Sequence, residues 1–252
     1  MKQVDLNCDM GESFGAWRMG DDGAILEHVS SANIACGFHA GDPGTMRATV
    51  SAALAKGVAL GAHPSFPDLQ GFGRRPMTLK PGEVYDLCVY QIGALAAFAR
   101  AAGGRLHHVK AHGALSNMAV REPALADAIT QAARDVDPEL ISYAQAGTEL
   151  VRAAQRIGLR FASEVFADRT YQDDGQLTPR SHPDAMIENV DDSIAQVLRM
   201  VREGRVRSLG GVDVAVRADT VCVHGDQPRA AEFARRLREA LAREGIAVAP
   251  CA

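Results

Sequence analysis

The sequence predicts an α/β fold in which seven parallel strands form a closed, incomplete or distorted (β/α) barrel. Seven short apolar or β-branched runs alternate with amphipathic stretches over 252 residues, an order typical of parallel sheets with crossover helices. Six of these runs end in His, Asp, Glu or Lys. Because the carboxyl ends of parallel strands converge on one face, these side chains indicate one shared pocket. An open doubly wound sheet is the alternative architecture.

The seven strands are expected where apolar, β-branched or small residues run together. Their ranges are 3–8, 32–38, 58–63, 107–112, 140–145, 160–166 and 220–224. Helices are expected between them, where apolar residues recur every three or four positions. Their ranges are 44–56, 83–102, 123–134, 146–157, 184–203 and 228–244. Pro81 stands just ahead of the second helical range, in the early position that a helix tolerates.

One segment interrupts this alternation. Residues 205–219 carry Gly210 and Gly211 between two short alternating runs, which indicates a β-hairpin inserted before the last strand. No linker rich in Pro, Gly and Ser divides the chain. We therefore interpret residues 1–252 as one barrel domain with a hairpin insertion.

Composition and charge narrow the classes of partner. Apolar residues make up 47% of the chain and charged residues 23%, as in a globular protein with a buried core. The net charge of −4 offers no broad attraction to nucleic acid or to anionic membrane. No run approaches the roughly 20 apolar residues of a membrane span. We expect neither a nucleic-acid partner nor a membrane partner.

Cysteine usage and the first residues favour a cytoplasmic protein. The five cysteines lack CxxC spacing, and three lie inside apolar runs, which is typical of reduced thiols. The chain enters a strand pattern at once, without the apolar region of a signal peptide. A cysteine nucleophile is not favoured, because a free cysteine is often simply a small buried hydrophobe.

The end of the first strand carries Asp5, Asn7, Asp9 and Glu12, with Gly11 allowing a tight turn. A carboxylate pair at this place could orient a water, accept a proton or bind a cation. The alternative is that Asp9 caps the turn and Glu12 is solvated. Asn7 and Asp9 share a face only if the strand continues through both.

The next two strand ends contribute His39 and His63. Asp42, which precedes a proline at a helix start, is interpreted as an ordinary N-cap, so His39 is the better functional candidate there. After His63 the chain continues into a segment with two glycines beside Arg74 and Arg75. This segment could form a mobile loop that binds a carboxylate or phosphate, or it could be a solvated basic loop.

The fourth strand end places Lys110 and His112 on one side of an extended chain, because side chains alternate with a period of two. A lysine inside an apolar strand needs a partner, which indicates a buried ion pair or a role in polarising an anionic substrate. His112 is a candidate acid or base near neutral pH. We expect His107 and His108 to be structural or exposed.

The last two strand ends add further polar groups. Glu164 in mid-strand suggests an interior charge with a partner, while Arg169 and Arg180 could hold carboxylates in the loops beyond. Arg180 could equally lie on the surface. His224 and Asp226 follow the final strand, where Asp226 could simply cap the next helix.

Several chemistries lack their sequence motifs. The chain has no GxxxxGK[ST] phosphate loop, no GxSxG elbow and no HExxH pair. The Asp and His residues permit metal-assisted hydrolysis, but their spacing matches no specific ligand motif. A divalent metal is therefore possible, and its ligands are not fixed by the sequence.

Six ordered motifs between Asp5 and Asp226 resemble the LamB/YcsF family. They are DLNCDMGE, NIACGFHAGD, GAHPSFPD with GFGRR, VKAHGAL, EVFADRTY and VCVHGD. Members of that family are similar to the seven-stranded barrels of the glycoside hydrolase/deacetylase type. The chain departs from the family pattern VKPHGALYN at two positions, with Ala111 and Ser116 in place of proline and tyrosine.

The resemblance implies a 5-oxoprolinase activity, which opens the lactam of 5-oxoproline (pyroglutamate) to L-glutamate while ATP is hydrolysed to ADP and phosphate. It also implies a complex with two further subunits, B and C. A five-membered lactam is a stable amide, and phosphorylation of its carbonyl oxygen would activate it. Because the chain lacks a P-loop, we expect the partner subunits to phosphorylate the substrate and this barrel to add water.

The residues and the resemblance together predict the site. The expected catalytic residues are Asp9, Glu12, His39, His63, Lys110 and His112. The expected substrate-binding residues are Asn7, Arg74, Glu164, Arg169 and His224. In this scheme Asp9 or His63 is the base for the attacking water, Lys110 stabilises the oxyanion, and Arg74 or Arg169 holds the substrate carboxylate.

Two other functions are compatible with the same residues. One is a metal-dependent deacetylase or amidohydrolase built on the same barrel. The other is a non-catalytic protein of the complex that only binds 5-oxoproline for its partners. Several histidines and acids on converging strand ends favour an enzyme over a binding protein.

Overall fold

The computed structural model describes residues 2–223 and 229–252 and contains a closed barrel of parallel strands. The seven barrel strands are β1 (Lys2–Met10), β2 (Ser31–Ala35), β3 (Ala59–His63), β4 (Leu106–Val109), β5 (Ile141–Gln145), β6 (Arg160–Phe166) and β9 (Thr220–Val223). The last strand, β9, pairs in parallel with both β6 and β1, which closes the ring. The predicted seven-stranded (β/α) barrel is confirmed, and it is closed rather than an open sheet.

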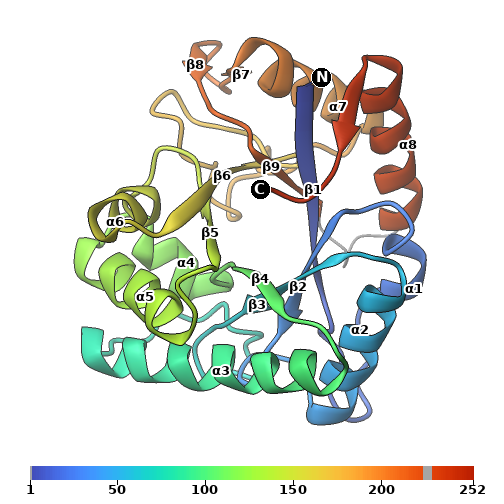
Figure 1. Ribbon diagram of the computed structural model, residues 1–252. Coiled ribbons are helices and arrows are strands. Elements are labelled where there is room, and N and C mark those ends of the chain that lie inside the picture. The colour runs from blue at the N-terminus through green and yellow to red at the C-terminus, as the bar shows by residue number, and fades with distance from the viewer. Residues whose placement is uncertain (1, 224–228) are drawn as a thin grey trace.

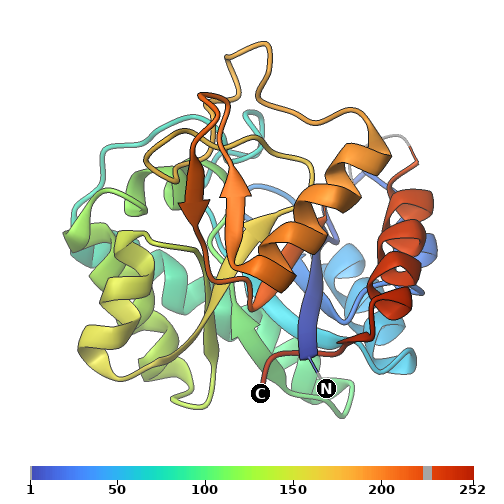
Figure 2. The same cartoon turned by 90° about the horizontal axis from the view of Figure 1, so that it is seen from above.

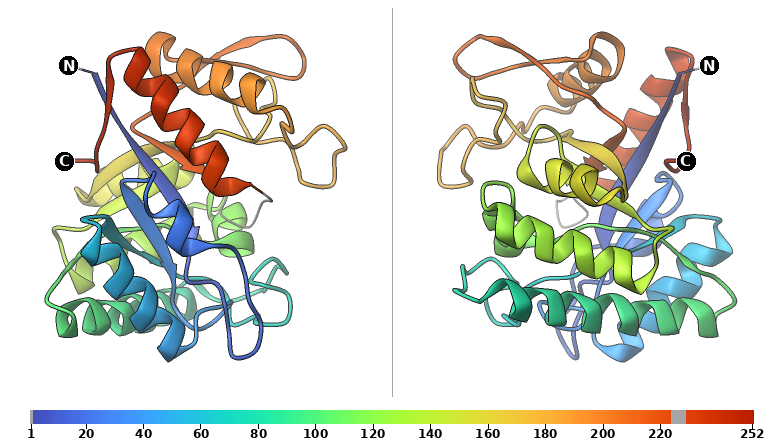
Figure 3. Two further views of the ribbon diagram at one scale, coloured as in Figure 1. Left: turned by 90° about the vertical axis from the view of Figure 1, so that its right-hand side faces the viewer. Right: turned by 60° about the vertical axis from the view of Figure 1, so that its left-hand side comes forward.

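Helices surround the strands on the outside, as Figure 1 shows. The described helices are α1 (Asp22–Ile25), α2 (Pro43–Ala55), α3 (Pro81–Ala101), α4 (Gly113–Ala119), α5 (Pro123–Val136), α6 (Glu149–Ile157), α7 (Val190–Glu203) and α8 (Ala230–Arg243). Figure 3 shows α3 and α5 lying side by side along one flank of the barrel. Each long helix turns an apolar stripe toward the strands, so the main hydrophobic core lies between the barrel and the helices.

Three short strands lie outside the ring. Strands β7 (Arg205–Arg207) and β8 (Asp213–Ala215) pair antiparallel around Gly210 and Gly211, and β10 (Ile246–Val248) pairs in parallel with the start of β1. Figure 2 shows both chain ends on one side of the molecule and the loop between β6 and α7 rising from the opposite side. The carboxyl ends of the barrel strands face that opposite side.

The interior of the barrel is polar. Side chains alternate along β1, so Leu6, Cys8 and Met10 belong to the outer hydrophobic core. The residues of the other face, Asp5 and Asn7, instead bond to side chains of other strands inside the ring.

A buried carboxylate anchors the amino end of this interior. Asp5 Oδ1 accepts from the Ser30 hydroxyl (2.5 Å) and the Ser31 hydroxyl (2.8 Å), and Oδ2 accepts from the Thr220 hydroxyl (2.6 Å). Burial raises the pKa of Asp5, and these hydrogen bonds oppose that rise. The network joins three strands, so Asp5 holds the ring together at the end far from the loops.

The fourth strand is shorter than expected. We predict a strand over 107–112, but β4 ends at Val109 and the short helix α4 follows. The extended chain nonetheless continues, because the backbone N–H groups of Lys110 and His112 donate to the carbonyls of Ala62 and Pro64 (both 2.9 Å). The period of two therefore still applies to Lys110 and His112, although the register is irregular.

Within the part of the chain that the structure describes, no helix is both long and apolar enough to cross a membrane.

Candidate active site

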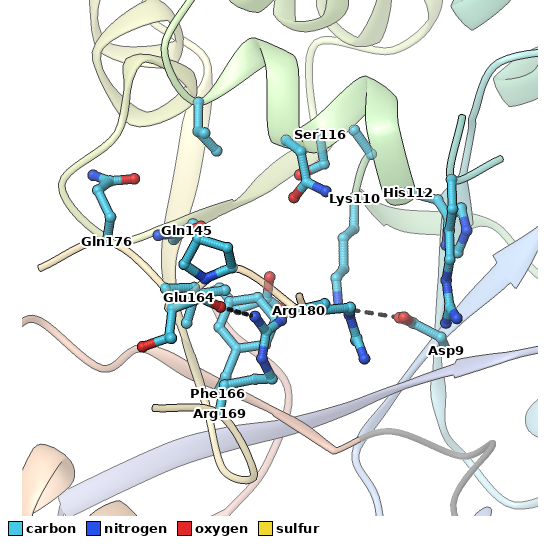
Figure 4. A pocket seen from close by; sticks show the side chains of 18 of the residues that line it. Asp9, Lys110, His112, Ser116, Gln145, Glu164, Phe166, Arg169, Gln176 and Arg180 are labelled. Carbon is cyan, nitrogen blue, oxygen red and sulfur yellow. Dashed lines mark hydrogen bonds and ion pairs between the residues drawn. The ribbon is translucent and has the colours of Figure 1, made fainter. Parts of the chain in front are cut away.

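A cavity of about 550 Å³ opens at the carboxyl ends of the barrel strands. Figure 4 shows its side chains, with Asp9 and Lys110 pointing toward one another. Its lining comes from strand ends, from α4 and from the loop after β6. The lining residues are Asp9, His63, Arg74, Lys110, Ala111, His112, Gly113, Ser116, Asn117, Val120, Arg121, Gln145, Glu164, Phe166, Arg169, Gln176, Leu177, Thr178, Pro179 and Arg180.

Lys110 is the hub of the charged groups in this cavity. Its Nζ lies 2.8 Å from Glu164 Oε1, 3.0 Å from Asp9 Oδ1, 3.2 Å from Asn7 Oδ1 and 3.1 Å from Cys222 Sγ. Burial alone would lower the pKa of Lys110, but the neighbouring negative groups, Asp9 first, raise it well above its usual value. The structure thus supplies the carboxylate partners that a lysine in an apolar strand requires.

Asp9 is held on one side and open to the cavity on the other. Strand β1 runs through Met10, so Asn7 and Asp9 share the interior face. Asp9 Oδ1 accepts from Lys110 and from Asn33 Nδ2 (2.8 Å), while Oδ2 lies 3.3 Å from His63 Nε2. The Asp9 side chain is 15% exposed, against 3% for Glu164. Asp9 is therefore the carboxylate that a ligand in the cavity can reach more easily.

Three histidines and Glu12 form a second cluster beside Asp9. His39 Nε2 lies 3.6 Å from Glu12 Oε1, and His112 Nδ1 lies 3.8 Å from the same oxygen and 3.0 Å from His63 Nε2. The His39 and His112 rings stack with centroids 3.9 Å apart. All four side chains are buried.

Burial decides the protonation of this cluster. It lowers the pKa of His39 well below its usual value and that of His112 to about 3, and the neighbouring histidines add to both effects. Both rings are neutral at pH 7. One donor atom from each of Glu12, His39, His63 and His112 lies within 4.8 Å of the others, so these four residues could hold a metal ion.

The loop after β3 covers the histidines. Asp68 fixes it by accepting from the backbone N–H of Gly71 (3.0 Å) and from Arg75 Nε (2.8 Å). At Gly73 the φ angle is +66°, and a Cβ would lie 2.3 Å from Ser65 Oγ, so only glycine fits. Arg74 follows at the rim of the cavity and is exposed.

The two arginines of the loop after β6 differ in their surroundings. Arg169 is buried and donates from Nε to the Ala185 carbonyl (3.3 Å) and from Nη2 to the Thr178 carbonyl (2.5 Å). Burial lowers its pKa to about 10, and it remains charged. Arg180 lines the cavity and is exposed. Arg169 therefore holds the loop, and Arg180 is better placed to meet a ligand.

The structure brings most of the predicted site residues together. Asn7, Asp9, Glu12, His39, His63, Lys110, His112 and Glu164 form one connected group. Arg74 and Arg169 lie in the cavity wall. His224 lies outside the described residues. Among the neighbouring histidines, His107 is half-buried and His108 is buried inside the barrel, where its Nε2 donates to Asn33 Oδ1 (2.8 Å).

Several parts of the site are absent from the sequence prediction, among them Asn33, helix α4 and residues 176–179 of the loop after β6. Asn33 donates to both Asn7 (2.7 Å) and Asp9 (2.8 Å), and a buried polar residue in an apolar run is the signal that could have identified it. Helix α4 supplies Asn117 and the turn after it supplies Arg121. Its seven residues are too few for a clear helical period.

Comparison with known proteins gives close relatives over nearly the whole chain. The family model described as LamB/YcsF family matches residues 4–252. A Bordetella pertussis protein named as the A subunit of 5-oxoprolinase is 68% identical over 97% of both chains. A Brevibacillus brevis protein of the same name is 61% identical over 99% of this chain and 98% of its own.

Solved structures agree with the fold. The crystal structure of a lactam utilization protein from Thermus thermophilus has a TM-score of 0.94 at 51% identity, covering 98% of this chain and 99% of its own. A family 4 carbohydrate esterase from Streptomyces lividans has a TM-score of 0.52 at 12% identity and covers 98% of this chain and 91% of its own. The esterase supports the barrel type alone.

Proposed function

Because this chain belongs to the LamB/YcsF family, we propose that it is the A component of an ATP-dependent 5-oxoprolinase, which opens the 5-oxoproline lactam to L-glutamate. The observation that carries this proposal is the 68% identity, over 97% of both chains, to a protein named as the A subunit of 5-oxoprolinase. That name implies an enzyme of several subunits. The charged cavity at the strand ends supports a hydrolytic role within it.

The proposed chemistry starts from the stability of the lactam. ATP transfers its γ-phosphoryl group to the carbonyl oxygen, leaving ADP. Water then attacks the activated carbon, the carbon–nitrogen bond breaks, and the nitrogen takes up a proton. The resulting acyl phosphate reacts with a second water to give L-glutamate and phosphate. This chain has no P-loop, so we assign the phosphorylation to the partner subunits B and C and the addition of water to this barrel.

Asp9 is the proposed general base. His63 Nδ1 lies 2.7 Å from the Lys110 carbonyl and donates to it, so His63 Nε2 and Asp9 Oδ2 are both acceptors at the cavity wall. Asp9 is the more exposed of the two, with 15% of its side chain accessible against 1% for His63. The base must contact a water molecule in the cavity, and Asp9 is more accessible to such a water than His63 is.

Lys110 and the arginines have separate proposed roles. The Lys110 ammonium holds Asp9 in place through its 3.0 Å contact, and it can stabilise the oxyanion only by exchanging one of its present acceptors. Arg169 is committed to backbone carbonyls. We therefore assign the substrate carboxylate to Arg74 and Arg180 at the rim.

The test is glutamate release from 5-oxoproline and ATP, with this chain alone and with its B and C partners. We expect release only when all three proteins are present. Asp9→Asn should abolish it, while Asp184→Asn, a change at a side chain that is 71% exposed, should not. Hydrolysis of ATP by this chain alone in the presence of 5-oxoproline would contradict the division of labour.

Other outcomes would favour the alternative functions. Glutamate release that survives the combined loss of Asp9, His39 and His63 would identify a protein that only binds the substrate. No release in any combination, together with amide or acetyl hydrolysis that requires a divalent ion, would identify a metal-dependent amidohydrolase or deacetylase. The cluster of Glu12 and three histidines is the observation that supports the metal-dependent alternative.

A further inference from the structure

The hydrogen bonds of two buried histidines fix where their protons are. His63 Nδ1 lies 2.7 Å from the Lys110 carbonyl oxygen, and His112 Nε2 lies 2.8 Å from the Phe72 carbonyl oxygen. A carbonyl oxygen can only accept, so both of these nitrogens carry hydrogen. In neutral rings, His63 Nε2 and His112 Nδ1 therefore both carry lone pairs. They face each other at 3.0 Å.

The groups around this pair are acceptors as well. Asp9 Oδ2 lies 3.3 Å from His63 Nε2, and Glu12 Oε1 lies 3.8 Å from His112 Nδ1. Two cations lie nearby. Lys110 Nζ contacts Asp9 through Oδ1, whereas the oxygen beside His63 is Oδ2, and Arg74 adds to the effect of burial in lowering the pKa values of His39 and His112. The two histidine lone pairs that face each other at 3.0 Å repel one another unless a proton or a cation lies between them.

His39 supplies a second, independent observation. Its side chain is fully buried, and neither ring nitrogen has a hydrogen-bond partner among the described residues. Its Nε2 lies 3.6 Å from Glu12 Oε1. A buried imidazole without hydrogen bonds is costly, and a bound cation would satisfy its lone pair.

We propose that Glu12, His39, His63 and His112 bind one divalent first-row transition-metal ion. Nitrogen and oxygen ligands at about 2.0–2.1 Å from a tetrahedral zinc lie about 3.3 Å apart. Three of the six separations between these donor atoms, 3.0, 3.6 and 3.8 Å, are close to that spacing, and all four atoms lie within 4.8 Å of one another. Imidazole with carboxylate is a ligand set that zinc, iron and nickel accept.

The hydrogen bonds of His63 and His112 serve such a site. Each ring donates its outer N–H to a backbone carbonyl, which holds the other nitrogen unprotonated and aimed inward. A single proton shared between His63 and His112 would relieve only that pair and would leave His39 without a hydrogen bond. An ion at the centre would contact all four residues once the stacked, nearly parallel rings of His39 and His112 turn so that both lone pairs point at it.

The four residues are buried, and the cavity beside them is the route by which an ion would reach them. His63 and His112 line the cavity, whereas Glu12 and His39 lie behind them. Binding depends on residues of this chain alone, so the inference does not rest on the proposed 5-oxoprolinase activity. Its test accordingly needs neither substrate nor partner proteins.

The experiment uses the full chain, stripped with a chelator and then titrated with Zn²⁺ by calorimetry. We expect one ion per chain and a rise in the thermal unfolding temperature. Co²⁺ in place of Zn²⁺ should give the visible absorption of a nitrogen- and oxygen-coordinated ion. His39→Ala and Glu12→Gln should weaken binding by more than the roughly 10- to 100-fold that loss of an outer hydrogen-bond partner costs. His182→Ala, at a side chain that is 48% exposed, should bind as the parent does.

Other results would overturn the proposal. Zn²⁺ binding that is absent at millimolar concentration, or that His39→Ala leaves unchanged, would exclude the site. If the variants fail to fold, ¹⁵N NMR of the histidine rings in the parent protein remains decisive. If the ¹⁵N signals of the inward ring nitrogens of His63 and His112 shift on addition of Zn²⁺, the proposal is supported. A His63 ring that stays protonated on both nitrogens would show a shared proton instead.

Discussion

At the scale of single residues, Lys110 separates two buried carboxylates. Its Nζ lies 3.0 Å from Asp9 and 2.8 Å from Glu164, whose side chain is 3% exposed. Replacing it by methionine leaves two negative charges facing each other without a counter-ion. We expect Lys110→Met to lower the free energy of unfolding by about 3–5 kcal/mol, measured by urea denaturation at pH 7.

Two variants control this prediction. Adding Glu164→Gln to Lys110→Met removes one of the opposed charges and should recover part of the lost stability. Lys56→Met removes an ion pair with Glu27 in which both side chains are partly or well exposed, and should change stability by about 0–1 kcal/mol. Equal effects of Lys110→Met and Lys56→Met would show that burial of the Lys110 pairs contributes nothing.

His108 should make stability depend on pH. Burial lowers its pKa well below the usual value, and His107 and Lys110 add to that shift. The unfolded chain takes up a proton below about pH 6.5, and the folded chain does not. The folded state therefore loses stability as pH falls from about 7.5 to about 5.5, by about 1.4 kcal/mol per pH unit below about 6.5 for each such histidine.

The measurement is urea unfolding of the parent, His108→Gln and His182→Gln at several pH values. His108→Gln should reduce the slope of the unfolding free energy against pH by about 1.4 kcal/mol per pH unit, which corresponds to one bound proton. His182→Gln, at a side chain that is 48% exposed, should leave the slope as it is. An unchanged slope for His108→Gln would mean that His108 titrates alike in both states.

The sequence identifies charged residues in this site better than neutral ones. Lys110 and Glu164 stand out because a charge in an apolar strand needs a partner, and the structure pairs them at 2.8 Å. Asn33 has no charge, so the same argument is weaker for it. The tautomer of His63 depends on a carbonyl 47 positions away in the chain, and no local pattern indicates it.

At the scale of elements, the loop between β6 and α7 depends on Arg169. Its guanidinium bonds to the carbonyls of Thr178 and Ala185 and so joins the two halves of the loop. We expect Arg169→Met to speed hydrogen exchange of backbone amides over residues 176–187. Arg180 also contacts this loop, with its Nη1 3.8 Å from Met186 Sδ, so Arg180→Met should speed that exchange less than Arg169→Met does. It should raise the KM of the proposed 5-oxoproline reaction roughly 10- to 100-fold, as loss of a charge-assisted hydrogen bond does.

The two variants give opposite patterns only if the arginines have different roles. A large KM effect of Arg169→Met without faster exchange would assign Arg169 to the substrate, as the sequence alone allows. A KM unchanged in Arg180→Met would move the substrate carboxylate to Arg74 or elsewhere in the cavity.

Element boundaries follow the sequence where a local signal is strong. Helix α2 begins after Asp42, whose carboxylate accepts from the N–H groups of Gly44 (2.8 Å) and Thr45 (3.1 Å), as expected of an N-cap. Helix α7 begins at Val190 rather than near 184, because Asn189 caps it and the preceding residues belong to the loop that Arg169 holds. That boundary depends on tertiary contacts, which periodicity does not show.

At the scale of the whole molecule, the last residues cover the amino end of the barrel. His107 Nε2 donates to the Cys251 carbonyl (2.8 Å), Gln3 Nε2 to the Pro250 carbonyl (3.0 Å), and the Ala249 N–H to the Val4 carbonyl (3.2 Å). At about 1 kcal/mol for each hydrogen bond, deletion of residues 249–252 should lower the free energy of unfolding by about 3 kcal/mol.

The deletion should leave the far end of the barrel intact. Unfolding by urea measures the loss, and Zn²⁺ titration of the same variant reports whether the histidine cluster survives. Cys251→Ser keeps the backbone carbonyl and should cost less than about 1 kcal/mol. A deletion that costs no more than Cys251→Ser would show that the final residues do not support the barrel.

The closure of the barrel is the feature that the sequence leaves open. The strand and helix order favours a ring of seven strands but does not exclude an open sheet, because both have the same local patterns. The choice is made by the pairing of Asp5–Cys8 with Thr220–Val223. Those two segments are far apart in the sequence and become neighbours only in the folded structure, so no local pattern predicts their pairing.

That pairing also sets a waiting time during protein synthesis. One edge of β1 finds its partner strand about 215 residues later in the chain. At about 5–20 residues per second, a ribosome needs about 10–45 s to make that stretch. Throughout that interval the nascent chain presents an unpaired strand edge, and the Asp9–Lys110–Glu164 group has no enclosed barrel around it. The cavity that holds these charged residues is therefore enclosed only after β9 has been translated.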